Sequence, residues 1–268
     1  EKDMWKLLWI PPSMPYYKPG GVFVDKEGLT KKLVFSSWNA VPDAISTLLS
    51  YEAERRMLFS FEDLEKKDYT DISKYSTLLE YRMDKERVAT MPILTWMLPW
   101  RWLAEQYDPL EIAIKADHEL SPEEIVEIIQ LDIEVKLEKM GDSEEEGIED
   151  YKWYWMSLGS FDGMDTIEYI NNWRKSQEKI SEGLNKHIDF FIENVVNKTE
   201  LGRRPENLSR ILAQIAVAGP GTCTYRALKR SVDNISDEIA FNIAMDVGEG
   251  FRTLFNKPEN THLLRGIV

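Results

Sequence analysis

The sequence of 268 residues has one cysteine, three histidines and no long apolar run, and each shortage excludes a class of protein. A single thiol, Cys223, cannot build an internal disulfide framework and is typical of a reducing compartment, so we predict a cytoplasmic location. The most apolar stretch, residues 91–103, is interrupted by Pro92, Pro99 and Arg101, and no membrane-spanning segment is expected. No basic-then-apolar signal segment opens the chain.

The residue patterns of common chemical sites are also missing. No Gly-Lys pair occurs, so the sequence has no G-x-x-x-x-G-K-[ST] phosphate loop. The histidines at positions 118, 187 and 262 are too far apart in sequence for metal-ligand spacing. Gly-Pro-Gly-Thr at 219–222 leads into a helix, but its proline removes one N–H donor and no lysine follows, which favours a helix-to-helix turn over a phosphate site. We predict no catalytic residue, metal or cofactor in this chain.

Acidic residues are in excess, and the excess lies in the middle of the chain. The 47 Asp and Glu residues outnumber the 33 Lys and Arg residues, which gives a net charge of −14. Residues 61–200 carry a net charge of −17, whereas residues 1–60 carry +1 and residues 201–268 carry +2. A negative field repels phosphate backbones, so any nucleic-acid contact is expected on the two flanks. We interpret the middle as solvated helix faces, with a docking surface for a basic protein as the alternative.

Helical patterns account for most of the sequence. The clearest helix spans residues 121–141, where Ser121 is the N-cap, Glu124 completes a capping box and Gly141 ends the helix. Apolar spacing predicts one or two helices over residues 164–196 and further helices over residues 42–59, 209–219, 222–231 and 235–255. The last of these carries apolar side chains at helical spacing: Ile239, Ile243, Val247 and Phe251. We interpret the Trp-rich stretch 91–103 as a packing nexus.

One short strand is predicted near the N-terminus. Leu33-Val34-Phe35 is an apolar run between two lysines and two serines, which is typical of a buried strand that feeds the helix at 42–59. The predicted fold class is therefore mainly α, a helical domain with one or two short β-strands. We divide the chain into a lead-in with a strand–helix unit (1–60), an acidic helical segment (61–200) and a C-terminal helical segment packed with the rest (201–268).

The stretch from Lys32 to Trp38, KLVFSSW, followed by a helix, resembles the opening of the second RecA-like lobe of superfamily-2 helicases and Swi2/Snf2-type translocases. Three further stretches resemble large prokaryotic helicase-like proteins: WIPP at 9–12, SYEAER at 50–55 and GFRTLFN at 250–256. The resemblance implies a partial α/β RecA-like lobe with a large helical insertion. It also implies that ATP, Mg and hydrolase activity belong only to a parent protein, whose remaining helicase lobes are partners of this chain.

Two groups of residues are candidates for contact with nucleic acid. Three follow the predicted strand at its carboxyl end, where ligands collect in α/β sheets: Ser36, Ser37 and Trp38. Three are cations on one face of a predicted helix, either contacting phosphate or forming an ordinary surface stripe: Arg226, Lys229 and Arg230.

These observations predict a non-catalytic helical region of an ATP-dependent, DNA-binding translocase, which shapes the nucleic-acid path or docks a partner. The alternative is a self-standing helical module for protein–protein interaction, with no nucleotide chemistry. An enzyme with an unrecognised carboxylate site is a third possibility. Since no complete catalytic constellation occurs in the sequence, we predict that this chain alone is not an enzyme.

Overall fold

The structure is a computed structural model of the chain, and it describes residues 37–38, 40–58, 77–84, 87–140, 147–257 and 260–261. The chain divides into two units, Glu1–Leu78 with Asn256–Val268, and Leu79–Phe255. The described residues are mainly helical, which confirms the predicted fold class. The predicted strand at 33–35 and the candidate residue Ser36 lie outside the described residues. Within these ranges, no helix combines the length and the apolarity needed to cross a bilayer.

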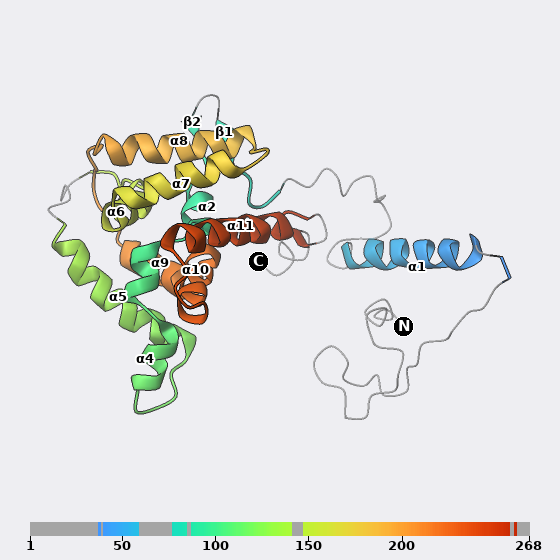
Figure 1. Cartoon of the computed structure of the whole chain (residues 1–268), viewed down its shortest axis with the longest axis horizontal. Coiled ribbons are helices and arrows are strands. Elements are labelled where there is room, and N and C mark those ends of the chain that lie inside the picture. The colour runs from blue at the N-terminus through green and yellow to red at the C-terminus, as the bar shows by residue number, and fades with distance from the viewer. Residues whose placement is uncertain are drawn as a thin grey trace. The chain divides into compact units, whose positions relative to one another are not determined.

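In the first unit, the structure describes helix α1 (Ala40–Leu58), close to the predicted range 42–59 (Figure 1). Ser37 and Trp38 come just before it, and the Trp38 carbonyl accepts a hydrogen bond of 3.1 Å from the N–H of Val41. Several large apolar side chains on α1 are exposed: Ile45, Leu48, Leu49 and Tyr51.

The second unit contains a short hairpin followed by helices (Figure 1). In chain order these elements are β1 (Met83–Asp84), β2 (Arg87–Val88), α2 (Met91–Met97), α3 (Arg101–Gln106), α4 (Pro109–Lys115), α5 (Pro122–Glu138), α6 (Trp153–Asp162), α7 (Met164–Ser176), α8 (Glu182–Val196), α9 (Leu208–Ala218), α10 (Pro220–Ser231) and α11 (Asp237–Phe255). The two strands pair antiparallel, with Met83 opposite Val88. The predicted helices match α5 and α7 to α11 with small shifts at their ends. The predicted helical range 164–196 is two helices, α7 and α8.

Short-range hydrogen bonds explain where several of these helices begin. The predicted capping box is present on α5, where Ser121 Oγ accepts from the Glu124 N–H at 3.3 Å and Glu124 Oε2 accepts from the Ser121 N–H at 2.8 Å. Asp108 Oδ1 accepts from the Leu110 N–H at 2.9 Å and caps α4. Ser181 caps α8 in the same way. These caps satisfy backbone donors that have no partner within their own helices.

Helices α2 and α3 lie at the centre of the core of the second unit. Trp100, between them, has no exposed surface, and its indole N–H donates to the Thr95 carbonyl at 2.6 Å. Leu94 and Leu103 are buried beside it. Helices α10 and α11 pack against each other and against α2, while α5 packs against α9. The interpretation of residues 91–103 as a packing nexus is therefore confirmed.

Two glycines allow α10 and α11 to approach the C-terminal end of α2 closely. A Cβ atom built on Gly221 would lie 2.1 Å from the Met97 carbonyl oxygen. A Cβ atom on Gly248 would lie 2.6 Å from the same oxygen. Both distances are far below van der Waals contact, and the obstructing atom belongs to the backbone. No residue with a side chain fits at either position unless the helices move apart.

Helix α11 buries one face and leaves several large apolar side chains exposed on the other. Its buried face consists of Ala240, Phe241, Ala244, Met245 and Gly248. Three of the apolar residues that the sequence placed at helical spacing are on the outside: Ile239 is 54% exposed, Ile243 is 40% exposed and Phe251 is 44% exposed. Their spacing indicates the helix correctly, but these side chains do not form the core of this unit.

Candidate functional site

The structure places the described candidate residues in different units. Ser37 and Trp38 lie just before α1 in the first unit, and Trp38 is 74% exposed. The three predicted cations lie on α10 in the second unit, on one helix as predicted.

Arg226 is turned into the protein and is only 8% exposed. Its Nε donates to the Ala104 carbonyl at 3.2 Å, and its Nη2 donates to the Ala216 carbonyl at 2.6 Å. These carbonyls belong to the last turns of α3 and α9, where they have no partner within the helix. Burial lowers the pKa of Arg226 from its ordinary value. Arg226 therefore joins the negative ends of two helices, and its position does not favour contact with phosphate.

Lys229 and Arg230 stay on the surface of α10, and each has a carboxylate partner. Lys229 Nζ lies 2.8 Å from Asp237 Oδ1. Arg230 Nη1 lies 3.1 Å from Asp108 Oδ2. A nucleic acid would have to displace these carboxylates to contact either cation. Contact of Lys229 and Arg230 with phosphate stays a prediction.

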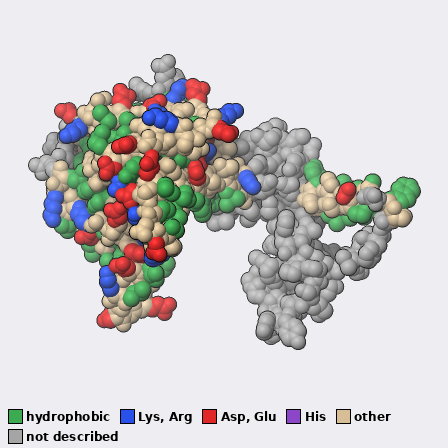
Figure 2. Space-filling model, in the orientation of Figure 1, with side chains coloured by type: hydrophobic (Ala, Val, Ile, Leu, Met, Phe, Trp, Pro, Cys, Tyr) green, Lys and Arg blue, Asp and Glu red, His purple; other side chains and the backbone are tan. Residues whose placement is uncertain are grey.

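The same pairing involves other cations of the C-terminal segment. Three arginines pair with glutamates of the acidic middle segment: Arg203 with Glu149, Arg204 with Glu134 and Arg210 with Glu123. On the face of this unit that Figure 2 shows, acidic and basic side chains are interspersed. Exposed ion pairs contribute little to stability. In these ion pairs, however, the three arginines of the basic C-terminal segment neutralise glutamates of the same chain.

Asp162, at the end of α6, is a strongly buried carboxylate, and burial raises its pKa to about 6. It accepts hydrogen bonds from the backbone N–H groups of Arg101 and Trp102, at 3.0 and 2.7 Å, and from the Thr166 hydroxyl at 2.9 Å. These donors belong to the start of α3 and to α7. The carboxylate thus holds three helices together and is structural. Among the described residues, no group of three or more His, Cys, Asp or Glu side chains is placed to hold a metal ion.

Asp162 gives a pH dependence with a defined sign. In the unfolded chain its pKa is near 3.8, and in the folded protein it is about 6, so between these values the folded state binds the additional proton. The free energy of unfolding is therefore expected to fall as the pH rises through this window, by roughly 3 kcal/mol. Urea unfolding at about pH 4 and about pH 7 measures this change. The variant Asp162→Asn should lose this part of the pH dependence, and an unchanged dependence in the variant would contradict the assignment.

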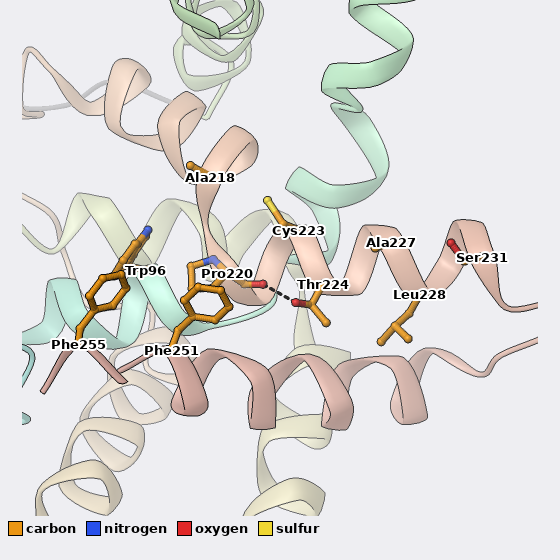
Figure 3. Close-up of a pocket in the computed structure, with 10 residues that line it drawn as sticks. All are labelled: Trp96, Ala218, Pro220, Cys223, Thr224, Ala227, Leu228, Ser231, Phe251 and Phe255. Atoms are coloured by element: carbon orange, nitrogen blue, oxygen red, sulfur yellow. Dashed lines mark hydrogen bonds between the residues drawn. The ribbon is translucent and has the colours of Figure 1, made fainter. Parts of the chain in front are cut away.

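A hollow lined by uncharged residues lies between α10 and α11 (Figure 3). Phe251 and Phe255 project from α11, Pro220, Cys223 and Leu228 come from α10, and Trp96 comes from α2. The Trp96 and Phe255 ring centroids are 6.3 Å apart, so these rings form one aromatic wall. None of the ten lining residues carries a charge.

A second hollow continues on the other side of Trp96 and Ala218, which line both. Its remaining walls include Ile211 and Ile215 of α9 and the rings of Tyr151 and Tyr154, and it also contains no charged residue. We call the two hollows together the apolar groove. It runs from α11 and α10 across Trp96 to α9 and α6, and all of it lies in the second unit.

The sequence analysis missed this groove because its walls come from helices that are distant in the chain. One signal was present on α10, where the side away from Lys229 carries small uncharged residues at helical spacing: Pro220, Cys223, Thr224, Ala227 and Ser231. This pattern indicates a helix face without charged residues and without the large apolar side chains of a core. It does not indicate which other helices complete the groove.

The comparisons with known proteins add no assignment to this site. No protein-family model matches the sequence, and no match was found among curated proteins or solved structures. The fold and the groove are therefore interpreted from the residues of this chain alone.

Proposed function

We propose that this chain is a helical protein-association module, and that the apolar groove and the adjoining outer face of α11 form its binding surface. The observation that carries the proposal is a contrast in charge. Charged residues make up 30% of the chain, yet none lines either hollow of the groove. A contiguous apolar surface on a charged protein marks an interaction site, because covering it removes apolar area from water.

The buried polar groups support association rather than catalysis. Arg226 and Asp162 would be the first candidates for chemistry in this unit, since a buried charge often marks an active site. Each is hydrogen-bonded to helix ends of its own fold. Neither lines the apolar groove. What the groove offers a partner is shape and apolar contact, which suit a protein segment with apolar side chains on one face.

Binding of the uncharged dye Nile red tests whether the groove is an accessible apolar surface. We expect the wild-type protein to enhance the dye's fluorescence. The variant Ala227→Glu, which places a charge on an exposed lining position of α10, should reduce the enhancement severalfold. The matched control is Ile114→Glu, on α4, where an isoleucine that is 72% exposed lies outside the groove. Equal dye binding by wild type and Ala227→Glu would remove the groove as the binding surface.

A second candidate function is the non-catalytic region of a nucleic-acid translocase. It is favoured by the exposed apolar side chains of α1, among them Leu48 and Leu49, because a helix of a RecA-like lobe packs such a face on its sheet. Labelled duplex DNA at low and moderate salt tests it. Binding that falls with salt and is lost on the double change Lys229→Glu with Arg230→Glu supports this candidate. No binding at low salt contradicts it.

A further inference from the structure

We propose that the outer side of α5 is a docking surface for a basic amphipathic helix of a partner protein. The surface, which we call the α5 face, consists of the apolar residues Ile128, Leu131 and Val135 and the carboxylates of Glu127 and Glu138. None of these residues lines the apolar groove, so the inference goes beyond the proposed function and does not depend on it.

Helix α5 is apolar on two opposite sides. One side is buried against the rest of the unit, where Ile129 and Ile133 are 1% and 0% exposed. The opposite side carries Ile128, Leu131 and Val135, which are 45%, 71% and 48% exposed. Their spacing of three and four residues places them in one row along the helix over ~10 Å. A helix that meets solvent on one side carries polar residues there, so a row of large apolar residues on the exposed side favours a second contact.

The charge of α5 indicates the chemistry of the partner. The helix carries six carboxylates and one lysine, which gives a net charge of −5. Three of the carboxylates form ion pairs with cations of the same chain: Glu123, Asp132 and Glu134. A fourth, Glu124, belongs to the capping box. The remaining two, Glu127 and Glu138, are those of the α5 face.

Glu127 and Glu138 lie on the same side of α5 as the apolar row. Glu127 is four residues before Leu131 and Glu138 is seven residues after it, and both spacings return to one side of an α-helix. Both glutamates are exposed, and no cation among the described residues forms an ion pair with either of them. The α5 face therefore presents two unpaired carboxylates, ~16 Å apart along the helix, beside a row of apolar side chains.

A basic amphipathic helix is complementary to both features. Its apolar side chains would cover the row and remove that surface from water. Its lysines or arginines, about three turns apart, would meet Glu127 and Glu138. The net charge of −17 over residues 61–200 attracts a positively charged partner over a longer range, and it repels nucleic acids and acidic proteins. Binding should therefore weaken as salt is added, because salt screens this attraction.

Fluorescence anisotropy with a labelled synthetic peptide tests the docking surface. The probe is a helical peptide of about four turns with leucines on one side and lysines on the other, and the control probe has glutamate in place of each lysine. We expect the full chain to bind the lysine peptide and not the glutamate peptide. Leu131→Gln and Val135→Gln should each raise the Kd by about tenfold. The matched control is Val196→Gln on α8, where a valine that is 49% exposed lies outside the α5 face, and it should leave the Kd unchanged.

A pair of charge variants tests the role of the two glutamates. Glu127→Gln combined with Glu138→Gln should raise the Kd about fivefold at low salt and reduce the salt dependence of binding. The control is Glu168→Gln combined with Glu193→Gln, which removes the same net charge from exposed positions of α7 and α8. Equal losses of affinity in the two double variants would mean that only the net charge attracts the peptide, and would overturn the α5 face.

The groove variant Ala227→Glu separates the α5 face from the apolar groove. It should leave binding of the lysine peptide unchanged. Loss of binding in Ala227→Glu but not in Leu131→Gln would overturn the α5 face and assign the peptide to the groove. A wild-type protein that does not bind the lysine peptide but still binds Nile red would overturn this inference and leave the proposed function standing. Because all these variants change exposed side chains, their thermal midpoints should stay within about 2 °C of the wild-type value, which separates loss of binding from misfolding.

Discussion

Gly221→Ala is expected to prevent stable folding of the second unit. The added Cβ atom would lie 2.1 Å from the Met97 carbonyl oxygen and 2.8 Å from backbone atoms of Leu98 and Pro99. These are backbone atoms, so no side-chain rotation relieves the clash, and α10 must move away from α2. In the core, the Trp100 N–H donates a hydrogen bond to Thr222 Oγ1 at 3.3 Å. The movement of α10 breaks this hydrogen bond. We expect a loss of at least ~4 kcal/mol.

Circular dichroism during heating measures this effect. Gly221→Ala should lower the thermal midpoint by about 10 °C or more, or abolish the cooperative transition. Gly250→Ala is the matched control, since the same change in the neighbouring helix meets no atom within 4 Å. If the two variants unfold at the same temperature, α10 does not pack on α2 as described.

Arg226→Met is expected to produce the second large effect, a loss of roughly 3 kcal/mol in the free energy of unfolding. Methionine keeps much of the side-chain volume but cannot donate to the carbonyls of Ala104 and Ala216. Two acceptors at helix ends then stay buried without partners, and their desolvation is no longer offset. Urea unfolding measures the change in the transition midpoint.

The control for Arg226→Met is Arg230→Met, one helical turn further along α10. Arg230 is exposed and pairs with Asp108, so its loss should cost less than ~1 kcal/mol. The comparison also separates the structural role of Arg226 from the role predicted by the sequence. If Arg226→Met unfolds like wild type but loses binding to duplex DNA, Arg226 contacts phosphate and the helix-joining role is wrong.

Local signals in the sequence predicted α1, α5 and α7 to α11 because the interactions that begin a helix are short in range, whereas the shorter helices α2, α3, α4 and α6 were not predicted. Ser121 and Glu124 lie three residues apart, and their side chains satisfy each other's backbone donors without help from the rest of the fold. The predicted turn at 219–222 is a junction at the single residue Gly219, and it likewise follows from local chemistry, because Pro220 cannot continue α9 and suits the first position of α10. In each case the residues that decide the structure are adjacent in the sequence.

The orientation of a helix face could not be predicted in the same way. The spacing of Arg226, Lys229 and Arg230 shows that they share a side of α10, but it does not show which helices lie beside them. Arg226 is inside because the ends of α3 and α9 meet there, and its acceptor Ala104 lies 122 residues earlier in the chain. Such a contact leaves no periodic pattern in the sequence around Arg226.

Helix α11 shows a related limit of periodicity. The large residues Ile239, Ile243 and Phe251 mark an apolar line, and a hydrophobicity argument favours burying them. The fold instead buries the face with Ala240, Phe241, Ala244, Met245 and Gly248, and at Gly248 the distance to α2 leaves no room for a side chain. The choice of buried face therefore depends on which helices lie beside α11, and the periodicity of the sequence does not show this.

The position of α2 and α3 ahead of their covering helices has a consequence for synthesis on the ribosome. Leu98 and Trp100 contact Thr222, which lies 124 and 122 residues later. At cellular rates of translation, roughly 10 s pass between the emergence of these two regions. During this interval α2 and α3 can pack on α6, α8 and α9 but lack the cover of α10 and α11, so part of the tryptophan-rich segment stays open to chaperones. A transcript truncated before α10 should yield an aggregating product.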